Sequence, residues 1–226
     1  MNVSTGPRAY PLRLLGTADP RQRRWSWLYK WILSFPHVVV LAVLWLAVAA
    51  VTLAAGIVVL FTGRYPRPMF DFVVGVLRWS WRVSFYAFGP VGTDVYPPFS
   101  LDHVPDFPAD LDVEYPVRLS RGLVLVKWWL LIIPQAMVVA VLSGGWGPAH
   151  FGLISLLALV AVVGRAFNGR YPDGLFQLIV GLQRWCYRVM AYGLLLTDAY
   201  PPFRLDLSEI ETTPAAARLR RPLPVQ

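Results

Sequence analysis

The sequence predicts an all-α integral membrane protein made of two tandem, pseudo-symmetric repeats. The 226-residue chain is 56% hydrophobic and only 15% charged, whereas soluble domains usually carry about 25% charged residues. Residues 31–63 and 128–164 contain no Asp, Glu, Lys or Arg. Apolar runs longer than about 18 residues are typical of membrane helices. A chain of this size could hardly bury two such runs in a soluble core.

An internal duplication supplies the repeat boundaries. The peptide Phe-Thr-Gly-Arg-Tyr-Pro at residues 61–66 returns as Phe-Asn-Gly-Arg-Tyr-Pro at residues 167–172. Residues 93–102, which contain Thr-Asp-Val-Tyr-Pro-Pro-Phe, match residues 197–206 at 8 of 10 positions. The beginnings also match, as Tyr-Pro-x-Arg-Leu at Tyr10 and again at Tyr115. We predict repeat 1 over residues 10–102 and repeat 2 over residues 115–206.

The chain begins with a basic segment, residues 1–30, which carries five arginines and Lys30. The apolar stretch that follows is longer than the core of a signal peptide, so we predict a retained cytoplasmic arm. Lys30 and Lys127 flank the two apolar stretches, and we expect their side chains to extend to the membrane interface.

Each apolar stretch is predicted to form a transmembrane helical hairpin, over residues 25–62 and 123–167. A single helix through residues 31–63 would be about 50 Å long, against a hydrocarbon core of about 30 Å. The turn-rich residues 143–150 interrupt the second stretch, and insertions are tolerated in connections. The first turn is therefore expected near residues 45–50.

Four membrane helices place all three basic blocks and both termini in the cytoplasm, as the positive-inside rule requires. This topology predicts a multi-pass protein of the bacterial plasma membrane. Hairpins that dip into one leaflet without crossing it are the alternative.

An arginine-striped amphipathic helix is predicted after each hairpin, over residues 68–88 and 174–194. Polar positions recur at spacings of 4, 3 and 4, which places them within about 60° on a helix. The arginines either face headgroup phosphates at the interface or turn toward the partner repeat in an embedded helix. The candidate headgroup-binding residues are Arg64, Arg78, Arg82, Arg170, Arg184 and Arg188.

Each repeat then ends in an extended Tyr-Pro-Pro-Phe segment, because adjacent prolines stop a helix. Asp94 and Asp198 are expected to cap backbone amides or to pair with an arginine of Gly-Arg-Tyr-Pro. Residues 103–114 are predicted to be an acidic linker, and residues 207–226 a basic, disordered tail. We interpret ten motif residues as structural: Tyr65, Pro66, Asp94, Pro97, Pro98, Tyr171, Pro172, Asp198, Pro201 and Pro202.

The motifs Phe-Thr-Gly-Arg-Tyr-Pro, Phe-Asp-Phe-Val-Val-Gly-Val-Leu-Arg-Trp and Tyr-Pro-Pro-Phe-Ser-Leu carry a family resemblance. Over residues 10–206 the chain resembles the bacterial membrane proteins grouped as domain of unknown function 4389. The resemblance implies a membrane protein with the unit once or twice and implies no reaction. The two copies differ where Gln177 replaces Asp71 and Asp173 replaces Arg67.

The sequence contains no recognisable catalytic, nucleotide-binding or metal-binding motif, so neither a cofactor nor a metal is predicted. The net charge of +8 favours anionic lipids over nucleic acid, because the arginines flank membrane segments. Our leading hypothesis is a non-enzymatic scaffold or accessory subunit of an envelope complex, with a membrane protein partner. The alternative is binding or transport of an anionic lipid or envelope precursor. A membrane enzyme using Asp71, Asp94 and Asp198 is the third hypothesis.

Overall fold

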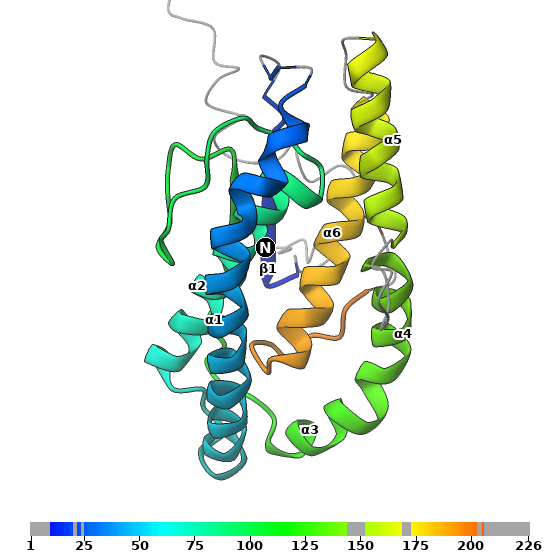
Figure 1. The fold of residues 1–226 in the computed structure, drawn as a ribbon. Helices are drawn as coiled ribbons and strands as arrows, with labels where there is room; N and C mark the ends of the chain where they lie inside the picture. Colours follow the sequence, from blue (N-terminus) through cyan, green and yellow to red (C-terminus); the bar gives the residue numbers. More distant parts are fainter. Residues whose placement is uncertain are drawn as a thin grey trace, which may run out of the picture.

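The computed structural model describes residues 10–19, 22–23, 25–143, 152–168, 173–202 and 205. These residues form helices and one short two-stranded sheet, to which β1 in Figure 1 belongs. The elements, in which η denotes a π-helix, are β1 (Leu12–Gly16), α1 (Trp27–Thr62), α2 (Arg67–Val83), η1 (Ser84–Phe88), β2 (Ala109–Val113), α3 (Arg121–Val126), η2 (Lys127–Leu131), α4 (Ile132–Ser143), α5 (Leu153–Asn168) and α6 (Asp173–Gly193).

The elements pack in three layers. Strand β2 packs on α2 and strand β1 packs on α6, so the sheet covers one side of these two inner helices. On their other side, α1 packs against α2, while α4 and α5 pack against α6. In Figure 1 the outer helices run in opposite directions, α1 downward and α3, α4 and α5 upward. One hydrophobic core connects the sheet, α2, α6 and the inner face of α1.

Helix α1 is continuous over 36 residues, about 54 Å at 1.5 Å per residue. The predicted hairpin over residues 25–62 is therefore wrong. Residues 45–50, where the turn was expected, contain neither Gly nor Pro, and Pro36 lies inside the helix without ending it. By length and composition α1 could cross a membrane.

The second apolar stretch also runs in one direction (Figure 1), because α5 continues upward from α4. Residues 144–151, which include most of the predicted turn, lie outside the described residues. The start of α4 and the end of α5 therefore lie at opposite ends of this segment (Figure 1), whereas a hairpin over residues 123–167 would place them side by side.

The antiparallel sheet corrects the all-α prediction. Its register pairs Leu12 with Val113 and Gly16 with Ala109. Side chains alternate between buried and more exposed along both strands, as expected for a sheet with one covered face. Strand β1 lies in the predicted basic arm, and β2 lies in the predicted acidic linker, residues 103–114.

The strands also give the structural relation between the repeats. Leu14 pairs with Leu111, 97 positions later, and β1 and β2 are offset by the same 97 positions along their whole length. The strands thus have equivalent positions, each ahead of the first helix of its repeat. The motif match between Tyr10 and Tyr115 has an offset of 105 instead. Because β1 packs on α6 and β2 on α2, the repeats exchange their first strands.

Candidate functional site

A buried lysine and a carboxylate form the same junction in both repeats. Lys30 Nζ lies 2.7 Å from Asp94 Oδ1 and donates a hydrogen bond to the Thr93 carbonyl at 2.7 Å. Lys127, which is 97 positions later, lies 2.6 Å from Asp198 Oδ1 and donates to the Thr197 carbonyl at 2.8 Å. Only 1% of each lysine side chain is exposed, so the expectation that they reach the membrane interface is wrong.

Each carboxylate also caps a backbone amide, as expected for Asp94 and Asp198. The amide of Arg23 donates to Asp94 Oδ2 at 2.7 Å, and the amide of Ser120 donates to Asp198 Oδ2 at 2.6 Å. The basic partner is a lysine, however, and not an arginine of Gly-Arg-Tyr-Pro. These bonds explain why each repeat contains Thr-Asp at this position. The threonine carbonyl and the aspartate carboxylate bind the lysine, and this joins the end of the repeat to its first helical segment.

The protonation of Asp94 follows from its surroundings. Burial alone would raise the pKa of Asp94. Hydrogen bonds from Lys30, from the amide of Arg23 and from the Ser26 hydroxyl outweigh that effect and hold this pKa below its ordinary value. Asp94 is therefore a carboxylate at neutral pH, stabilised by three donors.

The arginines of α2 bind backbone carbonyls. Arg78 donates to Leu111 at 2.8 Å and to Leu101 at 3.1 Å, and it lies 3.4 Å from the Asp110 carboxylate. Arg82, whose exposed fraction is 1%, donates to the carbonyls of Ser100 at 2.5 Å and Asp102 at 3.1 Å. Both side chains thus hold the segment between Tyr-Pro-Pro-Phe and β2.

The arginines of α6 are also internal. Arg184 donates to the Leu14 carbonyl at 3.3 Å, and Leu14 is the sheet partner of Leu111. The guanidinium of Arg188 lies 5.1 Å from the centre of the Tyr10 ring. The exposed fractions of Arg184 and Arg188 are 2% and 1%. Helices α2 and α6 therefore each use an arginine to bind the strand that packs on them.

The six predicted headgroup-binding arginines do not gather in one open crevice. Arg64 is exposed where α1 ends, whereas Arg82, Arg184 and Arg188 are buried. Arg170 lies outside the described residues, as do Tyr171 and Pro172.

The remaining motif residues shape chain reversals. Gly63 ends α1 in the left-handed conformation, with φ of 70°, and its N–H donates to the Val59 carbonyl, which explains the glycine of Gly-Arg-Tyr-Pro. Pro66 precedes α2 directly. Tyr65 is buried, and its carbonyl accepts a hydrogen bond from the Tyr115 hydroxyl.

A second duplicated contact was missed in the sequence because it joins different residue types. The Trp79 indole donates to His37 Nδ1 at 3.2 Å, and the Trp185 indole donates to Gln135 Oε1 at 3.1 Å. His37 and Gln135 are offset by 98 positions, one more than the lysines, and the π-helix η2 lies between Lys127 and Gln135. A π-turn accommodates one inserted residue.

Helix α1 has an inverted distribution of polarity. Its buried positions include Lys30, Ser34, His37 and Thr52, while large apolar side chains are exposed on the opposite side. Nine of the exposed ones recur at helical spacing within an arc of about 80°, here named the apolar stripe: Leu28, Ile32, Phe35, Val39, Val43, Leu46, Leu53, Ile57 and Phe61. Trp31 and other exposed apolar side chains flank this arc. A helix with its polar side inward and its apolar side outward is typical of membrane proteins.

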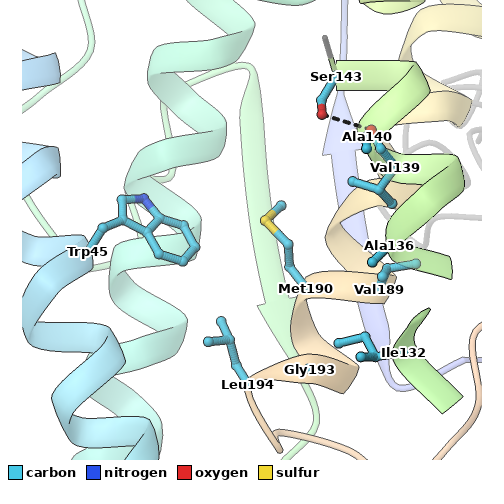
Figure 2. Close-up of a pocket in the computed structure, with 10 residues that line it drawn as sticks. All are labelled: Trp45, Ile132, Ala136, Val139, Ala140, Ser143, Val189, Met190, Gly193 and Leu194. Atoms are coloured by element: carbon cyan, nitrogen blue, oxygen red, sulfur yellow. Dashed lines mark hydrogen bonds between the residues drawn. The ribbon is translucent and has the colours of Figure 1, made fainter. Parts of the chain in front are cut away.

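An apolar groove of about 350 Å³ lies between α1 and α4, with α6 as its floor. Figure 2 shows Trp45 on one side, Ile132, Ala136, Val139 and Ala140 on the other, and Met190 between them. The Ser143 hydroxyl at the rim donates to the Val139 carbonyl. The groove therefore suits a hydrocarbon chain better than a polar ligand.

A polar pocket of about 500 Å³ lies on the opposite side, between α2 and β2. Asp71 lines this pocket, and its Oδ1 lies 3.3 Å from Arg67 Nε. The Arg67 guanidinium lies over the Tyr115 ring, 4.6 Å from its centre. Asp102, Asp112 and Glu114 complete its charged lining. Within the described part of the chain, no three His, Cys, Asp or Glu residues are grouped to hold a metal.

The three aspartates proposed for an enzyme do not come together. Asp94 and Asp198 are bound to Lys30 and Lys127 in separate junctions, and Asp71 is 58% exposed beside Arg67. Each carboxylate already has a basic partner, so the arrangement does not resemble a paired acid and base.

No curated protein and no solved structure matches the chain. The model of the family described as Domain of unknown function (DUF4389) matches residues 24–100 and again residues 123–204. Both matches begin after a strand and include the junction residues, so the family unit comprises the helices and the Tyr-Pro-Pro-Phe segment of each repeat. The chain belongs to the DUF4389 family and carries two tandem copies of its unit.

Proposed function

We propose that the protein is a membrane-embedded, non-enzymatic scaffold or accessory subunit of an envelope complex. The observation that carries this proposal is the inverted polarity of α1, which exposes the apolar stripe and buries Lys30 and His37. Full burial of one large apolar side chain contributes about 1.5–3 kcal/mol. Nine such side chains on one helix face are therefore strongly stabilised by lipid contact.

The scaffold role is supported by how the charged groups are used. Lys30, Lys127, Arg78 and Arg184 hold strands and chain ends together, and the polar pocket leaves a charged surface opposite the apolar stripe. A rigid body that is apolar on one side and charged on the other suits a protein that holds a partner at the membrane.

Membrane fractionation followed by affinity purification tests the proposal. We expect the full-length protein to stay in carbonate-washed membranes, to require detergent for release, and to co-purify with one partner in constant ratio. Release by carbonate or high salt would overturn the membrane assignment. A monodisperse protein without a partner, purified from native membranes in mild detergent, would overturn the scaffold role alone.

Lipid binding is the second candidate, and the apolar groove favours it. Ala136→Trp places a large ring in the groove, whereas Leu46→Trp adds one on the apolar stripe. Native mass spectrometry should show retained lipid for the natural protein and for Leu46→Trp, and loss of lipid for Ala136→Trp. Equal retention by all three proteins, at equal melting temperature, would remove this candidate.

A further inference from the structure

We infer that the protein lies in one leaflet of an anionic bilayer, with α1 and the α3–α5 segment parallel to the membrane plane and neither crossing it. This inference rests on the proposed membrane association and adds an orientation to it. It replaces a multi-pass topology with a monotopic one.

The apolar surface extends along the full length of both outer helices. The apolar stripe begins at Leu28, one residue after the start of α1, and ends at Phe61, one residue before its end. The outer side of the second repeat is equally apolar. Its most exposed large apolar side chains, from α3 to the end of α5, are Leu125, Leu130, Ile133, Met137, Val141, Leu156, Val160 and Phe167.

Both apolar surfaces point away from the sheet. The buried side of α1 packs on α2, the buried sides of α4 and α5 pack on α6, and the sheet covers the far side of α2 and α6. The molecule therefore has an apolar face formed by the outer helices and, on the far side of α2 and α6, a polar face formed by the sheet.

Charged groups on the polar face lie level with the middle of α1. Arg78 binds the carbonyl of Leu111 in β2, and the Trp81 indole binds that of Leu15 in β1. The same part of α2 lies beside the middle of α1, because the Trp45 indole donates to the Ser80 hydroxyl at 3.2 Å. The sheet therefore lies level with the middle of α1.

Arg13 and Asp112, which face each other across the two strands, are exposed at that level. The polar pocket continues the charged surface along α2 as far as Arg67, near the end of α1. If α1 crossed a bilayer, Arg13 and Asp112 would lie near the centre of the hydrocarbon, exposed to lipid. Charged side chains at that depth face the interior of a bundle or a watery cavity, so this orientation is strongly unfavourable.

The in-plane orientation also places the basic residues at both ends of α1 at the level of the lipid headgroups. Arg64, Arg118 and Arg121 are exposed at one end of α1. At the other end, Arg165 of α5 donates hydrogen bonds to Gln22, beside Arg23. A crossing helix would place these two basic ends on opposite sides of the membrane. In one leaflet both lie at the same headgroup level, where anionic lipids attract them.

Depth measurements on spin-labelled protein test the inference. In a Cys186→Ala background, single cysteines replace Ile32, Leu46 or Phe61 on the apolar stripe, and Arg13 on the polar face. The labelled full-length proteins are placed in vesicles of phosphatidylglycerol and phosphatidylcholine, and electron paramagnetic resonance compares accessibility to oxygen and to a water-soluble nickel complex.

We expect the three stripe positions, which span about 44 Å of helix, to share one shallow depth within the acyl region, and Arg13→Cys to be accessible to nickel. A deep label at Leu46 between shallow labels at Ile32 and Phe61 would overturn the in-plane orientation while keeping membrane association. Nickel accessibility at all four positions would overturn membrane association itself.

A second measurement is independent of depth. An impermeant maleimide added to sealed vesicles of one orientation should label Trp25→Cys and Thr62→Cys from the same side. Labelling of these two positions from opposite sides would contradict the inference. Native Cys186 is buried, with an exposed fraction of 4%, so its replacement removes background with little change of surface.

Discussion

At the residue scale, the two junctions show how a charged side chain is kept inside an apolar protein. Lys30 and Lys127 are each enclosed by a carbonyl, a carboxylate and an aromatic ring, with Tyr86 at 5.3 Å and Tyr192 at 4.7 Å from the nitrogen. The charge is compensated within hydrogen-bond distance, so burial is tolerated. The same side chain without its carboxylate would be an isolated charge in a low-dielectric environment.

Removing one member of the junction should therefore destabilise the protein more than removing both. We expect Asp94→Asn to lower the free energy of unfolding by about 3–5 kcal/mol, because Lys30 loses its counter-charge. Lys30→Met with Asp94→Asn should recover much of that loss. Denaturant unfolding in detergent measures both variants.

Asp71→Asn is the matched control, since it removes an exposed pair with Arg67 four residues away. Such a pair contributes about 0.3–0.5 kcal/mol. If Asp94→Asn and Asp71→Asn lowered the free energy of unfolding by similar amounts, the Lys30 ammonium would not depend on Asp94 as its buried counter-charge.

The same junction gives a pH dependence. The pKa of Asp94 is lower in the folded protein than its ordinary value of 3.8. Its contribution to stability is therefore complete above about pH 4 and is lost as the pH falls through the folded pKa. Melting temperature measured from pH 7 to pH 3 should fall more steeply for the natural protein than for Asp94→Asn. Parallel curves would mean that Asp94 titrates normally.

At the element scale, a glycine at a helix end and a glycine inside a helix follow different rules. Gly63 adopts a φ of 70°, and a side chain there is strained in any surroundings. Gly122 lies in α3, and a Cβ added to it would meet no atom within 4 Å.

These two glycines should respond oppositely to alanine. We expect Gly63→Ala to lower stability by about 1 kcal/mol because of the left-handed conformation, and Gly122→Ala to raise it by up to about 1 kcal/mol because alanine favours a helix. Thermal unfolding of both variants checks the signs. A stabilising Gly63→Ala would contradict the left-handed end of α1.

The elements that the sequence predicted well are those with a local pattern. The arginine-striped helices appear at residues 67–88, including η1, and 173–193, because their polar spacing depends only on helix geometry. The hairpin turn near residues 45–50 was wrong because it was inferred from the length of the apolar stretch, the interruption at residues 143–150 and the positive-inside rule. The segment itself contains no turn residue. The strands were missed because β1 and β2 pair across nearly 100 residues and because Asp110 and Asp112 resemble a linker.

The partners of the site residues were also hard to predict. Asp94 and Asp198 were recognised as amide caps from their motif. Lys30 and Lys127 share the pattern Leu-x-Lys-Trp, but they lie 64 and 71 residues before their carboxylates, and nothing in that pattern indicates the pairing. Arg78 and Arg184 were identified by their stripe, whereas their carbonyl partners on β2 and β1 depend on the exchanged strands. The sequence pattern thus identified the hydrogen-bond donors, but only the tertiary structure shows which carbonyls accept their bonds.

At the scale of the whole molecule, the two repeats are interlocked. Each inner helix binds the first strand of the other repeat through an arginine, Arg78 to Leu111 and Arg184 to Leu14. The residues of one repeat therefore complete the core of the other. Cooperative unfolding of both repeats together is the expected behaviour.

Cutting the chain between the repeats tests this. A break after His103, which is 58% exposed, leaves β1 with repeat 1 and β2 with repeat 2. Co-expressed fragments should co-purify through a tag on one of them, because each holds a strand of the other. Either fragment expressed alone should be degraded or aggregate. Two separately folded, non-associating halves would contradict strand exchange.

The exchange of strands also bears on the concentration at which the fold can exist. A chain with one strand and one set of helices could rebuild this sheet only by pairing with a second copy, so its folded fraction would depend on how many copies the membrane contains. Joining the two units in one polypeptide removes that dependence. The tandem protein folds by a unimolecular reaction and can persist at very few molecules per cell, where a dimer of separate units would dissociate.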